Sequence, residues 1–368
     1  MKSIKKLQSI KVIAPNFKKR LSGVTATISR LIPKQTNMIN ISTTGFGLPK
    51  SISRIPLLQC LRIPKITISG EANYVVWHAR RNTEMLGGLL LKYLFKRPLK
   101  LLFTSASQRK HTAYTQWLIS KMDSVIATSE ATKQYLSQPA EVVRHGIDVD
   151  EFYPIEDKLA LKKSLQLPVN QRIIGCIGRI RYQKGTDAFV ESMLELLPDF
   201  PDVTAFVIGR ATEKHLSFLT DLKSKVNAST VSKRILFLPE VPVDYVNRYY
   251  QSLDILVAPQ RWEGFGLTPL EAMSCGVPVV ATRVGAFPEL IQEGKTGYLI
   301  EPNSINGIVE ATRKILEMDN NDYTALASNA REHIVKSFPL EKEAETIVKI
   351  YQKLLKCEIP KRSESMGT

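Results

Sequence analysis

Residues 172–186 read RIIGCIGRIRYQKGT, and this stretch decides the fold class. The run RIIGCIGRI predicts a buried strand, and the basic segment GRIRYQKGT that ends it leads into a helix expected from Thr186. α/β proteins bind phosphate groups where a strand, a loop and a helix follow in this order. The final Lys-Gly-Thr lacks the Gly-Lys-Ser/Thr order of a Walker P-loop. Arg179 and Lys184 can still neutralise a diphosphate at the end of the strand, with a solvated basic loop as the alternative.

The same alternation of strand and helix extends in both directions. Strands are expected at residues 11–15, 74–77, 99–105, 124–129, 172–180, 203–210, 234–240, 254–260 and 277–284, and helices at residues 22–31, 83–95, 112–121, 186–197 and 342–356. A charged helix and a polar loop at residues 154–171 mark a boundary between two halves.

The pattern predicts two Rossmann-like, doubly wound parallel-sheet domains, residues 1–165 and 166–340. In residues 341–368 we expect a final helix that packs back toward the N-terminal domain, followed by a loose polar tail. The segment Gly45-Phe46-Gly47 begins a possible dinucleotide fingerprint, but no strong strand is expected before it and Lys50 occupies the third glycine position.

A second informative stretch is RWEGFGLTPLE, residues 261–271. We interpret Thr268 as an N-cap, Pro269 as the first helical residue and Glu271 as the partner that completes a T-x-x-E capping box. The helix start can hold an anion, and the two glycines before it allow close approach of a ligand. The alternative is that Glu271 only completes the cap. No capping rule explains Glu263, so it is the sharper candidate for chemistry.

The charge is distributed unevenly along the 368 residues, whose net charge is +16. Residues 1–165 hold 27 Lys and Arg against 10 Asp and Glu, whereas the remainder holds 24 against 25. The N-terminal half therefore favours a polyanionic partner, either nucleic acid or an anionic membrane surface, unless the charge serves solubility alone.

Several classes of protein are disfavoured. The four cysteines form no CxxC pair, and no histidines have metal-ligand spacing, so we expect reduced cysteines and neither a zinc site nor a catalytic triad. The basic N-terminus lacks a signal-peptide core, and no apolar run reaches 18 residues, so we expect neither secretion nor a membrane span. Among the histidines, only His78, His111 and His145 follow strands of the first domain, and each is expected to be structural rather than catalytic.

The segments GRIRYQKG, EGFGLTPLEAMSCGVPVVAT and VGAFPELIQEGKTGYLI together resemble the donor-binding signature of the retaining GT-B glycosyltransferases of family 4. The resemblance covers most of residues 172–302, and VIATSE and RHGIDVDEFYP in the first half also fit. It implies a GT-B fold whose two domains face each other across a cleft, a nucleotide-sugar donor, and no metal or other cofactor.

The resemblance also implies the roles of individual residues. Arg179 and Lys184 would hold the donor diphosphate, Glu263 the transferred sugar and Glu271 the ribose, and the first three are the expected catalytic residues. The complete donor set is Gly178, Arg179, Lys184, Glu263, Gly264, Phe265, Gly266, Leu267, Thr268 and Glu271. Many relatives carry a histidine where this chain has Thr104, so the acceptor-side candidates are Gly23, His78, Thr104 and His111.

More narrowly, IAPNFKKRLSGVTATI, WHARRNTEM and FTSASQRKHTAYTQWLI resemble the lipopolysaccharide-core mannosyltransferases of Gram-negative bacteria. That resemblance implies transfer of mannose from GDP-mannose to a Kdo sugar on lipid A, by a cytoplasmic enzyme peripheral on the inner face of the cytoplasmic membrane and without nucleic acid. The alternatives are a UDP-sugar-dependent family 4 enzyme with another glycolipid or polysaccharide acceptor and, more remotely, a non-catalytic polyanion-binding α/β protein.

Overall fold

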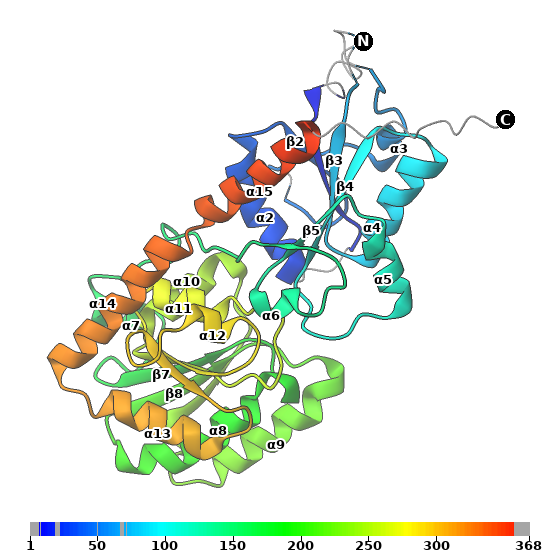
Figure 1. Cartoon of the computed structure of the whole chain (residues 1–368). Coiled ribbons are helices and arrows are strands. Elements are labelled where there is room, and N and C mark those ends of the chain that lie inside the picture. The colour runs from blue at the N-terminus through cyan, green and yellow to red at the C-terminus, as the bar shows by residue number, and fades with distance from the viewer. Residues whose placement is uncertain are drawn as a thin grey trace. The chain divides into compact units, whose positions relative to one another are not determined.

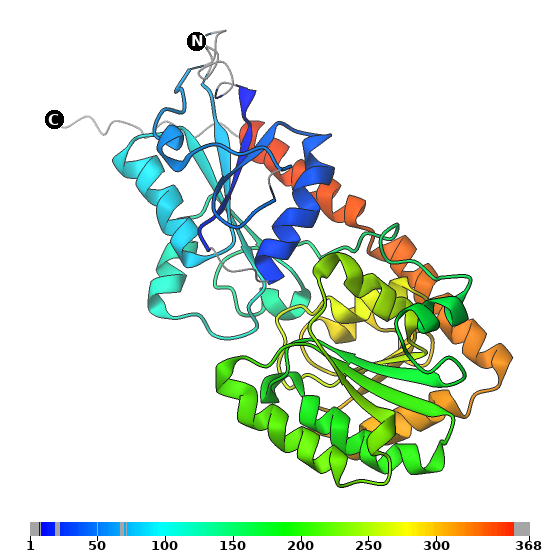
Figure 2. The ribbon, with the colours of Figure 1, turned by 180° about the vertical axis from the view of Figure 1, so that it is seen from behind.

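The computed structural model describes residues 7, 9–18, 23–49, 51–66, 70 and 72–356, and the chain divides into two compact units. Residues 1–144 and 341–368 form the first unit, and residues 145–340 form the second. Each unit is built on a six-stranded parallel sheet with helices on both faces (Figure 1, Figure 2). The predicted α/β class with two Rossmann-like sheets is therefore confirmed.

The sheet of the first unit has the order β2-β1-β3-β4-β5-β6. Its strands are β1 (Val12–Asn16), β2 (Ile41–Gly45), β3 (Val75–Ala79), β4 (Leu99–Ser105), β5 (Ser124–Ala127) and β6 (Glu141–Val142). Every residue of β1, β2 and β3 is buried, as expected of parallel strands covered on both faces.

The helices of the first unit are α2 (Gly23–Thr36), α3 (Leu57–Cys60), α4 (Asn82–Leu89) with the π-helix η1 (Leu90–Leu94), α5 (Ala113–Ser120), α6 (Glu130–Lys133) and α15 (Leu340–Lys356). A core that contains Trp77, Met85 and Leu118 joins the sheet to α4 and α5. The last helix packs within this unit, because Tyr351 bonds to His78 of β3 and Glu341 pairs with Lys34 of α2 at 2.6 Å.

The sheet of the second unit has the order β12-β11-β10-β7-β8-β9. Its strands are β7 (Arg172–Ile177), β8 (Val203–Ile208), β9 (Ile235–Leu238), β10 (Ile255–Ala258), β11 (Val279–Thr282) and β12 (Gly297–Ile300). Its helices are α7 (Lys158–Ser164), α8 (Thr186–Leu196), α9 (Leu216–Asn227), α10 (Val246–Ser252), α11 (Thr268–Ser274), α12 (Phe287–Leu290), α13 (Ile305–Leu316) and α14 (Asn320–Ser337), with 3-10 turns η2 (Tyr182–Lys184), η3 (Leu197–Asp199), η4 (Glu213–His215), η5 (Ser232–Arg234) and η6 (Val243–Tyr245).

Two separate cores cover the two faces of this second sheet. Side chains alternate between the faces, so Ile174 packs into the core shared with α8, α9 and α13, whereas its neighbour Ile173 packs into the core shared with α10, α11 and α14. Both faces are thus fully committed to packing, and the loops at the strand ends remain available for function.

Several elements were not expected from the sequence: strands β2, β6 and β12, and helices α3, α9, α10, α12, α13 and α14. A buried strand, β2, directly precedes Phe46, so the statement that no strong strand precedes this glycine pair is wrong. The helix expected over residues 83–95 is α for only eight residues and continues as the π-helix η1.

The change from the first unit to the second falls between Arg144 and His145, earlier than residue 165. Residues 145–165 belong to the second unit because α7 is anchored there: Lys158 and Lys162 both pair with Asp254, at 2.7 and 3.3 Å. With this division the first unit holds 30 Lys and Arg against 10 Asp and Glu, and the second holds 21 against 25. The first unit therefore carries a net positive charge and the second a small net negative charge. The tail predicted to be loose lies outside the described residues.

Candidate active site

The two informative stretches meet at one edge of the second sheet. β7 and β10 are neighbours and run parallel, so the loops that follow them emerge side by side. From this point the strand order proceeds in opposite directions, toward β8 on one side and β11 on the other. Such a switch point is where open α/β sheets bind ligands, at the carboxyl ends of the strands.

The loop after β7 is held tightly against the loop after β10. Gly185 has a φ of +70°, and a Cβ at this position would lie 1.9 Å from the carbonyl oxygen of Pro259. Only glycine allows this approach. Gly185 is also the N-cap of α8, which has no side-chain cap, so Lys184 is presented directly at the start of an eleven-residue helix.

Arg261 fastens the same two loops from the other side. Its guanidinium donates to both carboxylate oxygens of Asp187, at 2.6 and 2.9 Å, and stacks 3.7 Å from the centroid of the Tyr182 ring. A bidentate pair with a stacked ring fixes the geometry of both loops. The residue that opens the predicted stretch 261–271 is therefore a structural clamp.

Two of the predicted catalytic residues contact each other. The ammonium group of Lys184 forms a short ion pair with Oε2 of Glu263, and the backbone N–H of Gly264 donates to Oε1 of the same carboxylate at 3.0 Å. Their side chains are 21% and 17% exposed, so the pair is accessible yet largely shielded from water. Lys184 could thus neutralise a diphosphate, and the neighbouring carboxylate of Glu263 could accept a hydrogen bond from a sugar hydroxyl.

Arg179 is exposed at the same edge, and beside it lies a cation that the sequence analysis did not identify. The Nε of Arg181 is buried and has no hydrogen-bond partner. Burial and the neighbouring Arg179 lower the pKa of Arg181, while Glu263 raises it. A buried N–H donor without a partner, close to other charged groups, is chemically suited to bind an anion. The only sequence signal was its place in GRIRYQKG.

The predicted capping box at Thr268 is wrong. α11 begins one residue earlier than expected, with Leu267 in the N-cap position and no side-chain cap. The hydroxyl oxygen of Thr268 is buried without a hydrogen-bond partner. Upstream, Gly264 is buried, Gly266 is half-buried, and Phe265 packs against the ring of His145 at 4.8 Å.

Glu271 lies in the first turn of α11 and is only 8% exposed. Its Oε2 accepts a hydrogen bond of 2.7 Å from the hydroxyl of Tyr250, which is itself fully buried. The carboxylate is thus fixed from behind by α10. Its predicted contact with a ribose stays a prediction.

In the first unit the structure joins two of the acceptor-side candidates. His78 lies on β3 and Thr104 on β4, and Nε2 of His78 is 2.6 Å from the Thr104 hydroxyl. Nδ1 of the same ring is 2.6 Å from the Tyr351 hydroxyl. Burial and the nearby Arg80 hold the pKa of His78 well below its ordinary value, so the ring is neutral. Its bond to Thr104 can orient that hydroxyl.

The other two acceptor-side candidates lie apart from this chain of hydrogen bonds. Burial and Arg109 lower the pKa of His111, whose Nε2 is buried without a hydrogen-bond partner. Gly23 is the first residue of α2, one residue after the expected start of that helix.

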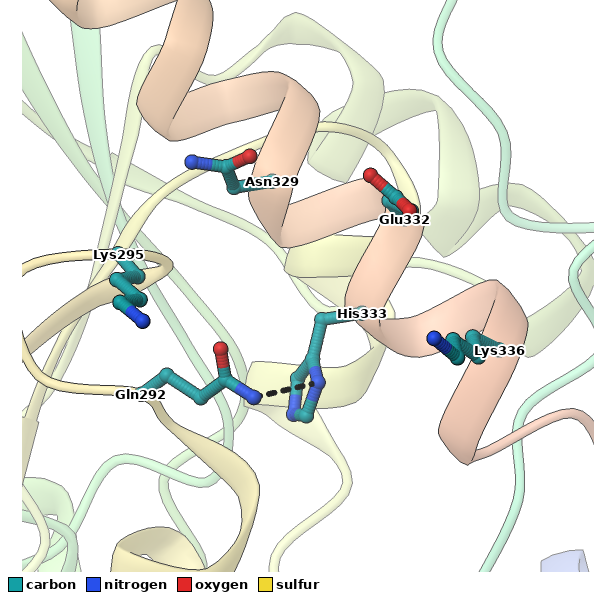
Figure 3. Close-up of a pocket in the computed structure, with 6 residues that line it drawn as sticks. All are labelled: Gln292, Lys295, Asn329, Glu332, His333 and Lys336. Atoms are coloured by element: carbon teal, nitrogen blue, oxygen red, sulfur yellow. Dashed lines mark hydrogen bonds between the residues drawn. The ribbon is translucent and has the colours of Figure 1, made fainter.

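Two further features bear on the location of the site. Among the described residues, no cluster of three or more His, Cys, Asp or Glu side chains could hold a metal ion. A pocket of about 430 Å³ lies between the 292–295 turn and α14 (Figure 3). Its lining comprises Gln292, Lys295, Asn329, Glu332, His333 and Lys336. None of these is a predicted site residue, so this pocket is separate from the switch point.

The comparisons with known proteins agree with this geometry. The family described as "Glycosyl transferases group 1" matches residues 157–333, which include the whole switch point. The lipopolysaccharide core biosynthesis mannosyltransferase LpsB of Rhizobium meliloti (strain 1021) is 46% identical over 95% of this chain and 99% of its own length. LpcC of Rhizobium leguminosarum bv. viciae, which carries the same description, is 45% identical over 95% and 98%.

A solved structure supports the fold. Anabaena Alr3699/HepE, crystallised with UDP, superimposes with a TM-score of 0.80 over 94% of this chain and 100% of its own, at 18% identity. The alternative of a non-catalytic polyanion-binding protein is wrong, because the close relatives are enzymes. The chain is a hexosyltransferase of GT-B fold that belongs to the group 1 glycosyl transferases, in the family that includes the lipopolysaccharide core biosynthesis mannosyltransferases.

Proposed function

We propose that this enzyme transfers mannose from GDP-mannose to the Kdo inner core of lipopolysaccharide, with retention of anomeric configuration. The printed descriptions of two relatives at 46% and 45% identity support the sugar and the pathway. The observation that carries the chemistry is the Lys184–Glu263 pair at the switch point of the second sheet.

In this proposal the donor diphosphate lies over the loop after β7. Arg179, Arg181 and Lys184 neutralise it, and the unpaired Nε of Arg181 gains its missing acceptor. Three cations can stabilise the negative charge that develops on the leaving nucleoside diphosphate. This supports our expectation that the enzyme requires no metal ion, which elsewhere supplies the same neutralisation.

Glu263 accepts hydrogen bonds from hydroxyls of the transferred sugar. The backbone of Gly264, Phe265, Gly266 and Leu267 faces the donor, and the unpaired hydroxyl of Thr268 binds a phosphate oxygen. Glu271, fixed by Tyr250, accepts from the ribose hydroxyls. Gly178 allows the chain to turn away from the end of β7 beneath the donor.

The acceptor binds to the first unit, whose net charge of +20 suits a phosphorylated, membrane-embedded glycolipid. There the Thr104 hydroxyl, oriented by neutral His78, contacts the acceptor. No described helix is long and apolar enough to cross a membrane. We propose that the enzyme acts as a peripheral protein on the inner face of the cytoplasmic membrane.

A donor panel tests the assignment. Purified enzyme is incubated with a Kdo-containing lipid acceptor and GDP-mannose, UDP-glucose or UDP-galactose, and consumption of each donor is measured beside its effect on thermal unfolding. We expect GDP-mannose alone to be consumed and to raise the unfolding temperature. If a UDP-sugar did both and GDP-mannose did neither, the UDP-dependent alternative would replace the proposal.

A pair of variants tests the site independently of donor identity. Arg179→Ala and Glu263→Ala should each lower kcat by about 10² to 10³ with the preferred donor. Lys223→Ala, which removes an exposed charge on α9 of the same unit, serves as the control and should leave kcat unchanged. Activities of both variants within a few-fold of wild type would remove the proposed site.

A further inference from the structure

Part of the first unit exposes an apolar surface that neither the fold nor the candidate site uses. Seven large apolar side chains on α4, η1 and α5, or directly after η1, are between 37% and 67% exposed. They are Leu86, Leu90, Tyr93, Leu94, Phe95, Tyr114 and Trp117, and we refer to them as the α4–α5 surface. An isolated exposed leucine is ordinary, whereas such a group marks a binding surface.

The outward face of α4 and η1 is apolar by helical spacing. Met85 and Leu89 point into the core, while Leu86, Leu90 and Leu94 follow at steps of four residues on the other side. In η1 the N–H of Phe95 bonds to the carbonyl of Leu90 at 3.0 Å, and this wider turn keeps Leu94 and Phe95 near Leu90. A helix that is apolar on both sides is normally buried on both sides.

α5 extends the same surface. It lies beside α4 in both views of the chain, and Asn82 of α4 donates to Thr115 of α5 at 2.8 Å (Figure 1, Figure 2). On α5 the rings of Tyr114 and Trp117 are stacked, with centroids 6.4 Å apart and an angle of 20° between planes. The two helices therefore present one continuous group of leucine and aromatic side chains.

Cations border this surface. Residues 82–121 contain seven Lys and Arg and a single acidic residue, Glu84, which is buried. Lys96 follows η1, Arg109 and Lys110 precede α5, and Lys121 ends it, and all four are exposed. Protein–protein interfaces are depleted of lysine, whereas Tyr, Trp and Lys together are typical of a membrane interface.

We propose that the α4–α5 surface binds directly to an anionic phospholipid membrane. The leucines and aromatic rings enter the boundary between headgroups and acyl chains, and the bordering cations contact lipid phosphates. The inference rests on the proposed function for its purpose, because an enzyme with a lipid-linked acceptor gains from residence at that surface. It assigns the membrane contact to named residues of the first unit.

Flotation of the full-length protein with vesicles tests the assignment. Wild type should bind vesicles of phosphatidylcholine with phosphatidylglycerol, bind phosphatidylcholine alone more weakly, and be released by salt. The double variant Tyr93→Ser/Leu94→Ser should bind about tenfold more weakly to both vesicle types. Lys110→Ala should weaken binding to anionic vesicles alone, by roughly fivefold.

The chain offers a matched control in Leu159→Ser/Tyr245→Ser. These residues are of the same types and are 61% and 56% exposed, against 67% and 60% for Leu94 and Tyr93, but they lie on the second unit. The control should float like wild type. Equal flotation of the two double variants would overturn the proposal, as would a wild type that fails to float.

The experiments also distinguish membrane binding from self-association, and failure of the membrane proposal from failure of the proposed function. A wild type that forms dimers in solution, loses them in Tyr93→Ser/Leu94→Ser and never floats would identify the surface as a self-association face instead. With a water-soluble Kdo acceptor that lacks lipid, the same variant should retain wild-type kcat. A wild type that floats but transfers no mannose to this acceptor would refute the proposed function and leave the membrane surface standing.

Discussion

Replacement of Gly185 by alanine should separate the two loops that form the candidate site. Gly185 has a φ of +70°, and an added Cβ would lie 1.9 Å from the carbonyl oxygen of Pro259. An ordinary carbon–oxygen contact is about 3.3 Å, so one loop must move by roughly 1.4 Å. Because Lys184 and Glu263 sit on these two loops, their ion pair must open.

Gly294 provides a control with the same backbone strain. Its φ is +71°, and a Cβ there would meet no atom within 4 Å. The left-handed conformation lowers the free energy of unfolding of both alanine variants by about 1–2 kcal/mol. The clash lowers it by a further 1–3 kcal/mol, roughly, in Gly185→Ala alone. For a unit of this size each kcal/mol lowers the unfolding temperature by about 2–4 °C.

Differential scanning calorimetry and steady-state kinetics check this comparison. Gly294→Ala should unfold a few degrees below wild type with unchanged kcat/KM. Gly185→Ala should unfold roughly 5 °C below the control and lose about 10² in kcat/KM, the usual effect of a displacement of about 1 Å in a catalytic group. Equal unfolding temperatures and equal activities of the two variants would refute the argument that glycine holds these loops together.

Three further perturbations follow from unpaired or neutral buried groups. Arg181→Ala should raise the donor KM by about 10- to 100-fold without loss of stability, measured by steady-state kinetics and urea unfolding, and an unchanged KM would remove Arg181 from the site. Thr268→Val should weaken donor binding in calorimetric titrations yet leave stability equal or slightly higher, because it deletes a buried hydroxyl that has no partner. The pKa of His78 is depressed in the folded protein, so below about pH 6.5 the unfolded state binds a proton that the folded state does not. The free energy of unfolding therefore decreases as the pH is lowered, by up to about 1.4 kcal/mol per pH unit. The free energy of unfolding, measured with urea between about pH 7.5 and pH 5.5, should therefore depend less on pH in His78→Gln than in wild type. An equal pH dependence of the two proteins would contradict the buried neutral ring.

The sequence predicted those parts of the fold whose physical cause is local. Apolar runs such as residues 203–210 were predicted correctly as strands, because a parallel strand that is buried on both faces must be apolar along its length. β2 was missed because its sequence, ISTTG, is polar, although every residue is buried. Its hydroxyls are satisfied by a distant segment: Thr43 donates to the carbonyl of Ser53 at 3.0 Å, and Ser42 bonds to the Ser53 hydroxyl at 3.1 Å. No pattern within β2 reveals that partner.

The same distinction applies to the site. Lys184 and Glu263 are far apart in the sequence, yet their contact follows from a general rule, since each comes directly after one of two adjacent parallel strands. Arg181 and Arg261 could not be sorted in this way. One is a buried cation without a partner at Nε and the other a clamp on Asp187, and only the packing of the loops distinguishes them.

The failed capping box alters the interpretation of the 261–271 stretch. In a capping box the hydroxyl of Thr268 would accept a hydrogen bond from a backbone N–H in the first turn of the helix, and the carboxylate of Glu271 would accept one from the backbone N–H of Thr268. Because α11 starts at Thr268 with Leu267 as its N-cap, that hydroxyl has no bond to the helix, and Glu271 accepts from Tyr250 of another helix. An unpaired buried hydroxyl and a carboxylate held from behind are costly features for a helix start to retain for stability alone. Both are accounted for by a ligand that supplies an acceptor to Thr268 and donors to Glu271, as the phosphate and ribose of a nucleotide do.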